Sequence, residues 1–148
     1  MNWTAVQEGD AILPLDAQVD LAGVVKYLGA TWNFTRIFFD RDYAQRQGLP
    51  DTIVPGPLKL SLLSRMLIDW LEGAGEIRSI RCAYRRTDIP GLLRCRGLVL
   101  RSYEQSGERR LDCQLWIEND SGRRSASGAA TVVCYLTPRP PSLERKGE

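Results

Sequence analysis

The segment from Leu58 to Leu71 constrains the fold of this chain more than any other part of the sequence. Its apolar side chains recur around almost the whole circumference of a helix; they are Leu58, Leu60, Leu62, Leu63, Met66, Leu67, Trp70 and Leu71. Gly56 and Pro57 precede this segment, and proline is tolerated in the first turn of a helix. A helix this apolar is expected to be largely buried. We therefore predict one long central helix that ends near Glu72, before the glycines at positions 73 and 75.

The second half of the chain alternates between apolar and polar residues, a pattern that predicts β-strands. The expected strands span residues 76–86, 92–102, 109–118 and 125–136. Turn residues separate them, namely Pro90–Gly91, Ser106–Gly107 and the segment from Asn119 to Gly122. Because short turns join antiparallel neighbours, these strands are expected to form a meander.

The first half of the chain reads as loops and helices around one short strand. Asp20 can cap a helix over residues 21–29, and Asp40 can cap a shorter one that Gly48 ends. Residues 31–39 are expected to be extended or turned, because they are rich in aromatic and β-branched types. Helices that precede a run of strands indicate an α+β fold.

Length and composition indicate a single globular domain. The chain has 148 residues, of which 43% are hydrophobic and 26% are charged. This length supports one domain with a real core and is too short for two ordinary ones. We assign residues 1–137 to the domain. The proline-rich, charged residues 138–148 are expected to form a disordered tail.

Charge and cysteine patterns argue against several classes of protein. The net charge is +2 and basic residues are scattered among carboxylates, so nucleic acid is not an expected partner. Charges at positions 59, 65 and 69 exclude a membrane span in the apolar segment. No basic segment followed by an apolar run opens the chain, so we expect a cytoplasmic protein. The chain has no histidine, and no Cys-x-x-Cys pair occurs among Cys82, Cys95, Cys113 and Cys134. We expect no metal site and no cofactor, and interpret the cysteines as small buried hydrophobes.

A longer motif links the two halves of the chain. Residues 27–40 read Tyr-Leu-Gly-Ala-Thr-Trp-Asn-Phe-Thr-Arg-Ile-Phe-Phe-Asp, and residues 54–58 read Val-Pro-Gly-Pro-Leu. This arrangement resembles the MaoC-like (R)-specific enoyl-thioester hydratases. Their pattern runs roughly Tyr-Ala-x-x-x-Gly-Asp-x-Asn-Pro-Ile-His-x-Asp, followed by a glycine at the head of a long helix. The resemblance covers roughly residues 3–136 and implies a hot-dog fold, a curved antiparallel sheet around one long helix, with acyl-CoA thioesters as ligands.

The resemblance also implies which parts of a hydratase site this chain keeps. In that family an Asp and a His activate one water, and a backbone N–H at the helix head stabilises the thioester oxygen. The Asp position falls on Asn33, which cannot act as a base near neutral pH, and the His position falls on Phe38, which can only exclude water. Gly56 falls at the helix head. The family likeness thus implies a thioester site without its usual acid and base.

The remaining residues of the motif each allow two interpretations. Asn33 could orient water or contact a thioester, or only satisfy a turn. Asp40 could replace the missing base, although a helix cap or an ion pair with Arg36 or Arg41 explains it as well. Arg36 could contact a carboxylate or phosphate, or only pair with Asp40. The candidate catalytic residues are therefore Asn33 and Asp40, and the candidate substrate-binding residues are Pro55, Gly56, Arg36 and Phe38.

Two further groups of side chains suggest contacts with an acyl-CoA. The aromatic residues Trp32, Phe34, Phe38 and Phe39 indicate either an apolar, narrowed pocket or part of the core. Arginines on the predicted strands indicate a solvated sheet face. Some of Arg81, Arg85 and Arg86 could instead meet the phosphates of coenzyme A at a subunit edge.

Three functions remain open at this point. The leading hypothesis is a catalytically degenerate, acyl-binding or tunnel-forming subunit, paired with an active hydratase as heteromeric members of the family are. The second is an active acyl-CoA hydratase or thioesterase homodimer that uses other residues. The third is an acyl-CoA binding module without chemistry. The expected partners are an acyl-CoA thioester and a second hot-dog subunit, in a homodimer or a heterodimer.

Overall fold

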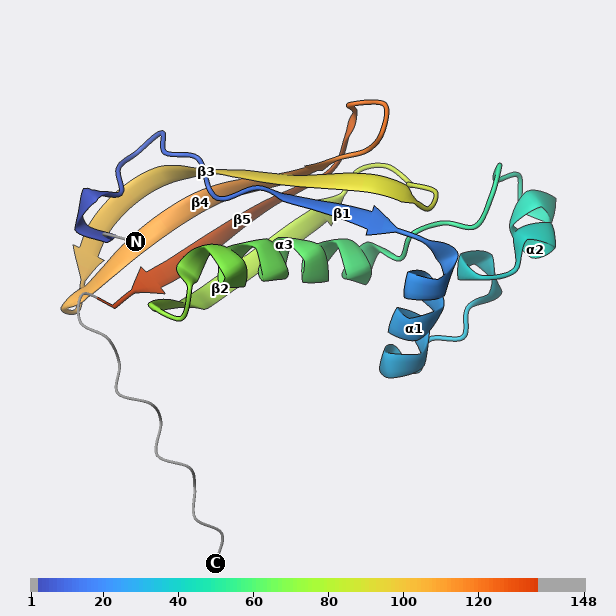
Figure 1. Cartoon of the computed structure of the whole chain (residues 1–148), viewed down its shortest axis with the longest axis horizontal. Coiled ribbons are helices and arrows are strands. Elements are labelled where there is room, and N and C mark those ends of the chain that lie inside the picture. Colours follow the sequence, from blue (N-terminus) through green and yellow to red (C-terminus); the bar gives the residue numbers. More distant parts are fainter. Residues whose placement is uncertain (1–2, 136–148) are drawn as a thin grey trace, which may run out of the picture.

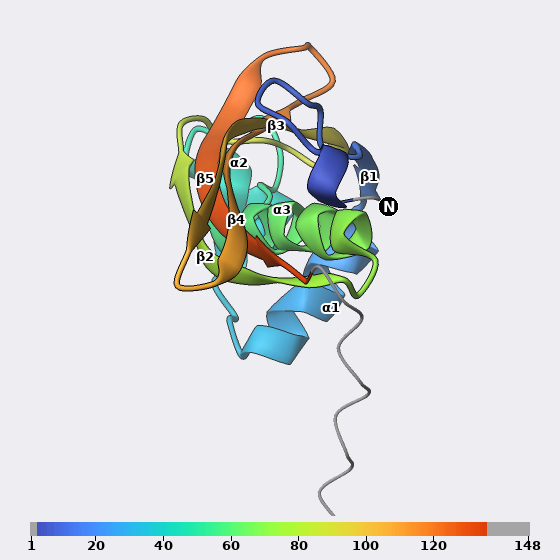
Figure 2. The ribbon, with the colours of Figure 1, turned by 90° about the vertical axis from the view of Figure 1, so that its left-hand side faces the viewer.

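One antiparallel sheet curls around one long helix in this chain (Figures 1 and 2). A computed structural model describes residues 3–135. The strands are β1 (Leu15–Val19), β2 (Gly75–Tyr84), β3 (Gly91–Gln105), β4 (Glu108–Glu118) and β5 (Arg124–Cys134), in the spatial order β1-β3-β4-β5-β2. The helices are α1 (Leu21–Thr31), α2 (Arg41–Arg46) and α3 (Gly56–Leu71), with short 3-10 turns η1 (Trp3–Ala5) and η2 (Arg36–Phe38). The predicted α+β hot-dog fold is confirmed, while the predicted tail, 138–148, lies outside the described residues.

Helix α3 occupies the concave side of the sheet, as its apolar circumference predicted (Figure 2). Its buried apolar side chains are Leu63, Met66, Leu67, Trp70 and Leu71. The Trp70 ring packs edge-on against Trp3, with ring centroids 5.1 Å apart. The helix begins at Gly56, earlier than predicted, and ends where Glu72 adopts a left-handed φ of 49°. Within residues 3–135 no helix is long and apolar enough to span a membrane.

The strands follow the predicted alternation, but the predicted meander was wrong for the first of them. Strand β2 pairs with β5 and not with β3, and the hydrogen bonds from Arg85 and Arg86 to Ser125 tie its end to the β5 side. On β4 the inward side chains are Leu111, Cys113, Leu115 and Ile117, all buried. Ser106 and Gly107 both have positive φ and close the β3–β4 hairpin. Strand β2 ends at Tyr84, two residues before the predicted end, because the N–H groups of Arg85 and Arg86 both donate to one acceptor, the Ser125 carbonyl oxygen. Arg85 and Arg86 consequently lie in the connection to β3.

The cysteines occupy the interior, as predicted. Cys95, Cys113 and Cys134 are buried, Cys82 is half-buried, and all four are free thiols. Burial raises the pKa of Cys95 and of Cys113 to about 12. These thiols stay protonated at neutral pH and act as small apolar side chains.

The helical segments between β1 and α3, namely α1, η2 and α2, gather at one end of the sheet (Figure 1). Asp20 caps α1, since its Oδ1 accepts a hydrogen bond from the Gly23 N–H at 2.7 Å. The helix passes the predicted end at Gly29 and stops where Trp32 adopts a left-handed φ of 52°. Trp32 and Phe34 are 83% and 62% exposed, so the expectation that both belong to a pocket or the core was wrong. Their rings pack edge-on against each other, 5.8 Å apart.

An ion pair between Arg41 and Asp51 joins the start of α2 to the loop before α3. Arg41 Nε donates to Asp51 Oδ1 at 3.0 Å, and this guanidinium lowers the pKa of Asp51 from 3.8 to about 2. Because the folded pKa is the lower one, the pair stabilises the fold above about pH 4 and stops doing so as the pH falls towards 2.

The melting temperature of Arg41→Gln should lie slightly below that of the natural chain at pH 7. In thermal unfolding the gap should close between about pH 4 and pH 2; a constant gap would contradict this assignment.

Candidate functional site

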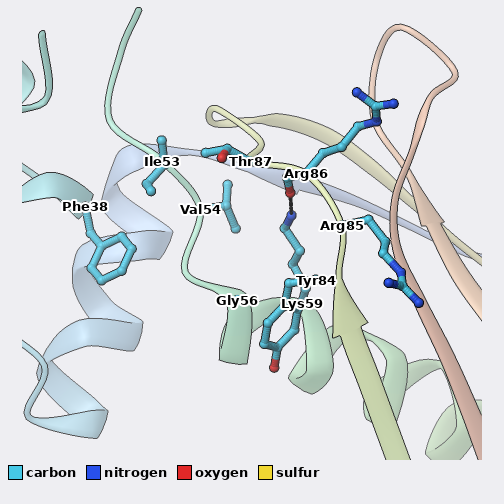
Figure 3. A pocket seen from close by; sticks show the side chains of 9 residues that line it. All are labelled: Phe38, Ile53, Val54, Gly56, Lys59, Tyr84, Arg85, Arg86 and Thr87. Atoms are coloured by element: carbon cyan, nitrogen blue, oxygen red, sulfur yellow. Dashed lines mark hydrogen bonds between the residues drawn. The ribbon is translucent and has the colours of Figure 1, made fainter. Parts of the chain in front are cut away.

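A cavity of about 350 Å³ opens at the head of α3, between η2 and the end of β2 (Figure 3). It is large enough for a small ligand group. The residues that line it are Phe38, Ile53, Val54, Gly56, Lys59, Tyr84, Arg85, Arg86 and Thr87. Two of the predicted site residues, Phe38 and Gly56, thus come together at one cavity.

The first turn of α3 leaves one backbone donor free. Pro55 occupies the N-cap position and makes no side-chain hydrogen bond to the helix, and Pro57 has no N–H. The Leu58 N–H donates to the Pro55 carbonyl oxygen at 3.1 Å. The Gly56 N–H has no acceptor among the described residues, as expected for the start of a helix, and the helix dipole favours negative charge there.

Glycine is the only residue type that fits at position 56 without movement of the neighbouring Tyr84 ring. A Cβ atom at Gly56 would lie 2.8 Å from ring atoms Cδ2 and Cε2 of Tyr84. The Tyr84 ring therefore forms a wall directly beside the helix head (Figure 3). Burial is the main reason that the pKa of this phenol is raised, so it stays protonated at neutral pH.

Phe38 and Asn33, on which the resemblance puts the histidine and aspartate of a hydratase, differ in their position relative to the cavity. Phe38 is half-buried, packs against the core and faces the cavity across from Gly56 (Figure 3). Asn33 is not among the residues that line the cavity. Its Oδ1 accepts hydrogen bonds from the Thr35 N–H at 3.2 Å and the Thr35 hydroxyl at 2.7 Å. Asn33 thus closes a local turn through its side-chain oxygen. Its side-chain nitrogen takes no part in that turn.

Asp40 and Arg36 are bound to each other away from the cavity. Asp40 Oδ1 accepts from the Tyr43 N–H at 2.9 Å and caps α2, while Arg36 Nε donates to Asp40 Oδ2 at 3.1 Å. The Tyr43 N–H, and after it the Arg36 guanidinium, lower the pKa of Asp40 below its ordinary value. Neither residue lines the cavity. A carboxylate engaged in this way is a weak candidate for a general base.

A buried ion pair lies beneath the cavity, and the sequence pattern did not predict it. Lys59 and Asp88 are 1% and 3% exposed. Lys59 Nζ lies 2.6 Å from Asp88 Oδ2 and donates to the Arg86 carbonyl oxygen at 2.8 Å. Asp88 Oδ1 accepts from the Asn119 side-chain nitrogen at 3.1 Å. The charges are thereby paired, as burial demands.

Exposed arginines border the cavity mouth. Arg85 and Arg86 line the cavity; the Arg86 guanidinium points away from α3, whereas the Arg85 side chain runs towards β5 (Figure 3). Arg85 donates to the Ser127 hydroxyl at 3.3 Å. Among the described residues, no carboxylate forms an ion pair with Arg81, Arg85 or Arg86. These three cations are therefore available to an anionic ligand.

Sequence reasoning located part of this site and missed the rest. Phe38 and Gly56 line the cavity and Pro55 caps its helix, whereas Asn33, Arg36 and Asp40 lie outside the lining. The missed lining residues are Ile53, Val54, Tyr84, Thr87 and above all Lys59. A lysine amid eight apolar helix positions was the available signal, because a charge on the buried face of a helix needs a partner.

Comparison with known proteins gives a family and a fold. The model of the family "hydroxyacyl-thioester dehydratase type 2" matches residues 7–90, more than half of the chain. A search of curated proteins gave no match.

Solved structures similar to this chain include several hydratases and dehydratases. R-hydratase PhaJ1 from Pseudomonas aeruginosa has a TM-score of 0.82 at 16% identity, and covers 95% of this chain and 94% of its own. The (R)-hydratase from A. caviae involved in PHA biosynthesis has a TM-score of 0.78 at 18% identity, over 90% and 98% of the two chains. A chain of the ChsH1–ChsH2 complex from Mycobacterium tuberculosis has a TM-score of 0.77 at 20% identity, over 86% and 98%. At these identities the likeness concerns the fold.

Proposed function

This chain belongs to the hydroxyacyl-thioester dehydratase type 2 family, and we propose that it binds acyl-CoA thioesters as a subunit without a hydratase's acid–base pair. The observation that carries the proposal is Gly56, which lines a cavity at the positive end of α3 and whose N–H has no acceptor within residues 3–135. A thioester carbonyl oxygen is the kind of acceptor that such a donor stabilises.

The proposed binding leaves a bound enoyl thioester polarised but unreacted. Hydration needs a base that takes a proton from water and an acid that protonates the α-carbon. Phe38 faces the cavity and is the residue on which the resemblance to MaoC-like hydratases puts their histidine, and its ring can neither accept nor donate a proton. Asn33 is engaged with Thr35, and Asp40 with Tyr43 and Arg36. These contacts support a binding role over chemistry in this chain alone.

The arginines at the cavity mouth support coenzyme A as the carrier of the acyl group. Arg85 and Arg86 line the same cavity as Gly56. Arginine donates to phosphate oxygens through several N–H groups at once. In the proposed arrangement the thioester oxygen meets the Gly56 N–H while the phosphates meet these guanidinium groups.

We place the chain in a dimer of hot-dog subunits, in which an active partner would supply the missing acid and base. Support comes from the likeness to a chain of the ChsH1–ChsH2 complex and from the edge position of β2, which within residues 3–135 has a neighbouring strand only on the β5 side. An unpaired edge strand readily adds a further strand. Free, buried cysteines agree with a reducing compartment such as the cytoplasm.

The test combines binding and turnover with the purified natural chain. Butyryl-CoA, which is saturated and cannot be hydrated, should bind saturably in isothermal titration calorimetry, and free coenzyme A should bind more weakly. Crotonyl-CoA should bind without loss of its enoyl absorbance. Hydration of crotonyl-CoA by the chain alone would favour the active homodimer instead. Absence of butyryl-CoA binding would overturn the proposal.

Substitution of Gly56 should weaken binding without unfolding the protein. In Gly56→Ala the new methyl group would push the Tyr84 ring, which is 46% exposed, towards the cavity. We expect the dissociation constant for butyryl-CoA to rise at least about 10-fold, the effect of one lost hydrogen bond. The matched control is Gly29→Ala, because no atom lies within 4 Å of a Cβ at that helical position. Equal affinities of the two variants would argue against a ligand at Gly56.

A further inference from the structure

Lys59 carries a charge that packing alone does not require. It lies in the first turn of α3, three residues after Gly56, with its ammonium group buried against Asp88. Desolvation of a buried ion pair can exceed the attraction between its charges, and apolar residues of similar volume often stabilise a fold as well or better. A buried pair at this place therefore calls for a role beyond stability.

Lys59, the cation of the pair, holds the backbone of the segment that carries Arg85 and Arg86. Lys59 Nζ donates to the Arg86 carbonyl oxygen at 2.8 Å, on the side of the backbone towards α3 (Figure 3). On the β5 side, the Arg85 and Arg86 N–H groups donate to the Ser125 carbonyl oxygen at 2.9 and 3.0 Å. The backbone of this segment is held from both sides, while both arginine side chains are exposed, that of Arg86 pointing away from α3 and that of Arg85 running towards β5 (Figure 3).

Asp88, the anion of the pair, holds the backbone of the segment that leads into Gly56. The Asp88 carbonyl oxygen accepts from the Val54 N–H at 2.8 Å, two residues before Gly56. The Asp88 carboxylate meets Lys59 on one oxygen and Asn119 on the other. The ion pair thus connects residues on both sides of Gly56 to the segment that carries Arg85 and Arg86.

We propose that Lys59, through Asp88, is a positioning residue that sets the Gly56 N–H and the Arg85–Arg86 guanidinium groups in one arrangement. This deepens the proposed function and rests on it. The arrangement recognises the two ends of a single ligand, a thioester oxygen at Gly56 and phosphate groups at the arginines. Lys59 itself touches neither end.

The experiment compares two ligands that differ in the phosphate-bearing part. Butyryl-CoA has the thioester and the phosphates, whereas butyryl-pantetheine has the thioester without phosphates. The natural chain should bind butyryl-CoA at least about 10-fold more tightly, as expected for charge-assisted hydrogen bonds to phosphate. Arg85→Ala/Arg86→Ala should bind both ligands with similar, low affinity.

The decisive variant removes the ion pair and keeps the volume. Lys59→Met/Asp88→Val should fold, and should lose the preference for butyryl-CoA although Arg85 and Arg86 are intact. Lys59→Arg, which keeps a donor and a charge, should retain most of the preference. If the apolar double variant does not fold, Lys59→Met/Asp88→Asn gives the same comparison, because it leaves no buried charge and keeps an oxygen for the hydrogen bond from Asn119.

The outcomes separate this proposal from the proposed function. A folded apolar double variant that still prefers butyryl-CoA about 10-fold would overturn the positioning role and leave the proposed function intact. A natural chain that binds neither ligand would overturn the proposed function, and the positioning role with it. A natural chain that binds both ligands equally would remove the arginines from the site and equally overturn the positioning role.

Discussion

The double variant Asn33→Asp/Phe38→His should hydrate crotonyl-CoA to the (R)-3-hydroxy product at least about 100-fold faster than the natural chain. A positioned acid or base contributes about 10²- to 10⁴-fold to such a reaction. Phe38 faces the cavity across from Gly56, so a histidine there reaches the space where the proposed thioester binds. An aspartate at position 33 can keep both hydrogen bonds from Thr35 and adds a carboxylate. Chiral separation of the hydroxyacyl product measures the gain.

The control for this gain is Asn33→Asp/Phe38→Leu. It opens the cavity to water as much as the histidine does but supplies no imidazole. It should remain as inactive as the natural chain, because space alone provides no proton donor. Equal activity of the two double variants would mean that the chemistry arises elsewhere. A fully active natural chain would mean that Phe38 does not occupy the place of a required histidine.

Lys59→Met should cost about 3–5 kcal/mol of the free energy of unfolding, because it leaves Asp88 charged, buried and without its cation. Asp88 is 3% exposed, and its carboxylate meets only Lys59 and Asn119 among the described residues. Since domains of this kind are stable by about 5–15 kcal/mol, this loss brings the variant close to unfolding. Equilibrium unfolding in urea measures it.

The same helix offers a matched control for the ion pair. Arg65 pairs with Asp69 at 3.4 Å on the exposed side of α3, where the two side chains are 69% and 49% exposed. Arg65→Met removes the same kind of charge and should change the free energy of unfolding by less than about 0.5 kcal/mol. A similar, small loss in both variants would show that the burial of Lys59 has no energetic consequence.

The main features of the fold followed from the sequence because they depend on local patterns. The apolar circumference of residues 58–71 required burial, and strands with one apolar face supplied the concave surface for it. Asp20 and Asp40 cap their helices as predicted, since an N-cap hydrogen bond spans only three residues. The curvature of the sheet came from the family resemblance rather than from periodicity. The strand order did not follow from the sequence, because the predicted meander holds for β3, β4 and β5 whereas β2 pairs with β5 across the sheet.

The parts of the site that escaped prediction depend on contacts between distant segments. Lys59 and Asp88 are 29 positions apart, and the local sequence around either residue does not predict its contact with the other. The prediction that Trp32 and Phe34 belong to a pocket or the core was wrong for the opposite reason, because it relied on a local signal, their aromatic character. The left-handed φ of Trp32 ends α1, and both side chains that follow the helix are exposed. For Asn33, named as a candidate catalytic residue, the alternative interpretation as a turn residue could be drawn from the sequence, since its bonds to Thr35 are local.

The most direct test of a thioester site at the head of α3 is the amide signal of Gly56 during a titration with butyryl-CoA. In ¹⁵N-resolved NMR spectra, the Gly56 N–H should shift downfield as it gains an acceptor, and saturate with the same dissociation constant as calorimetry reports. The Gly107 amide, in the β3–β4 hairpin, should stay unchanged. Butyryl-CoA binding that leaves the Gly56 signal in place, or shifts only amides remote from α3, would contradict the account.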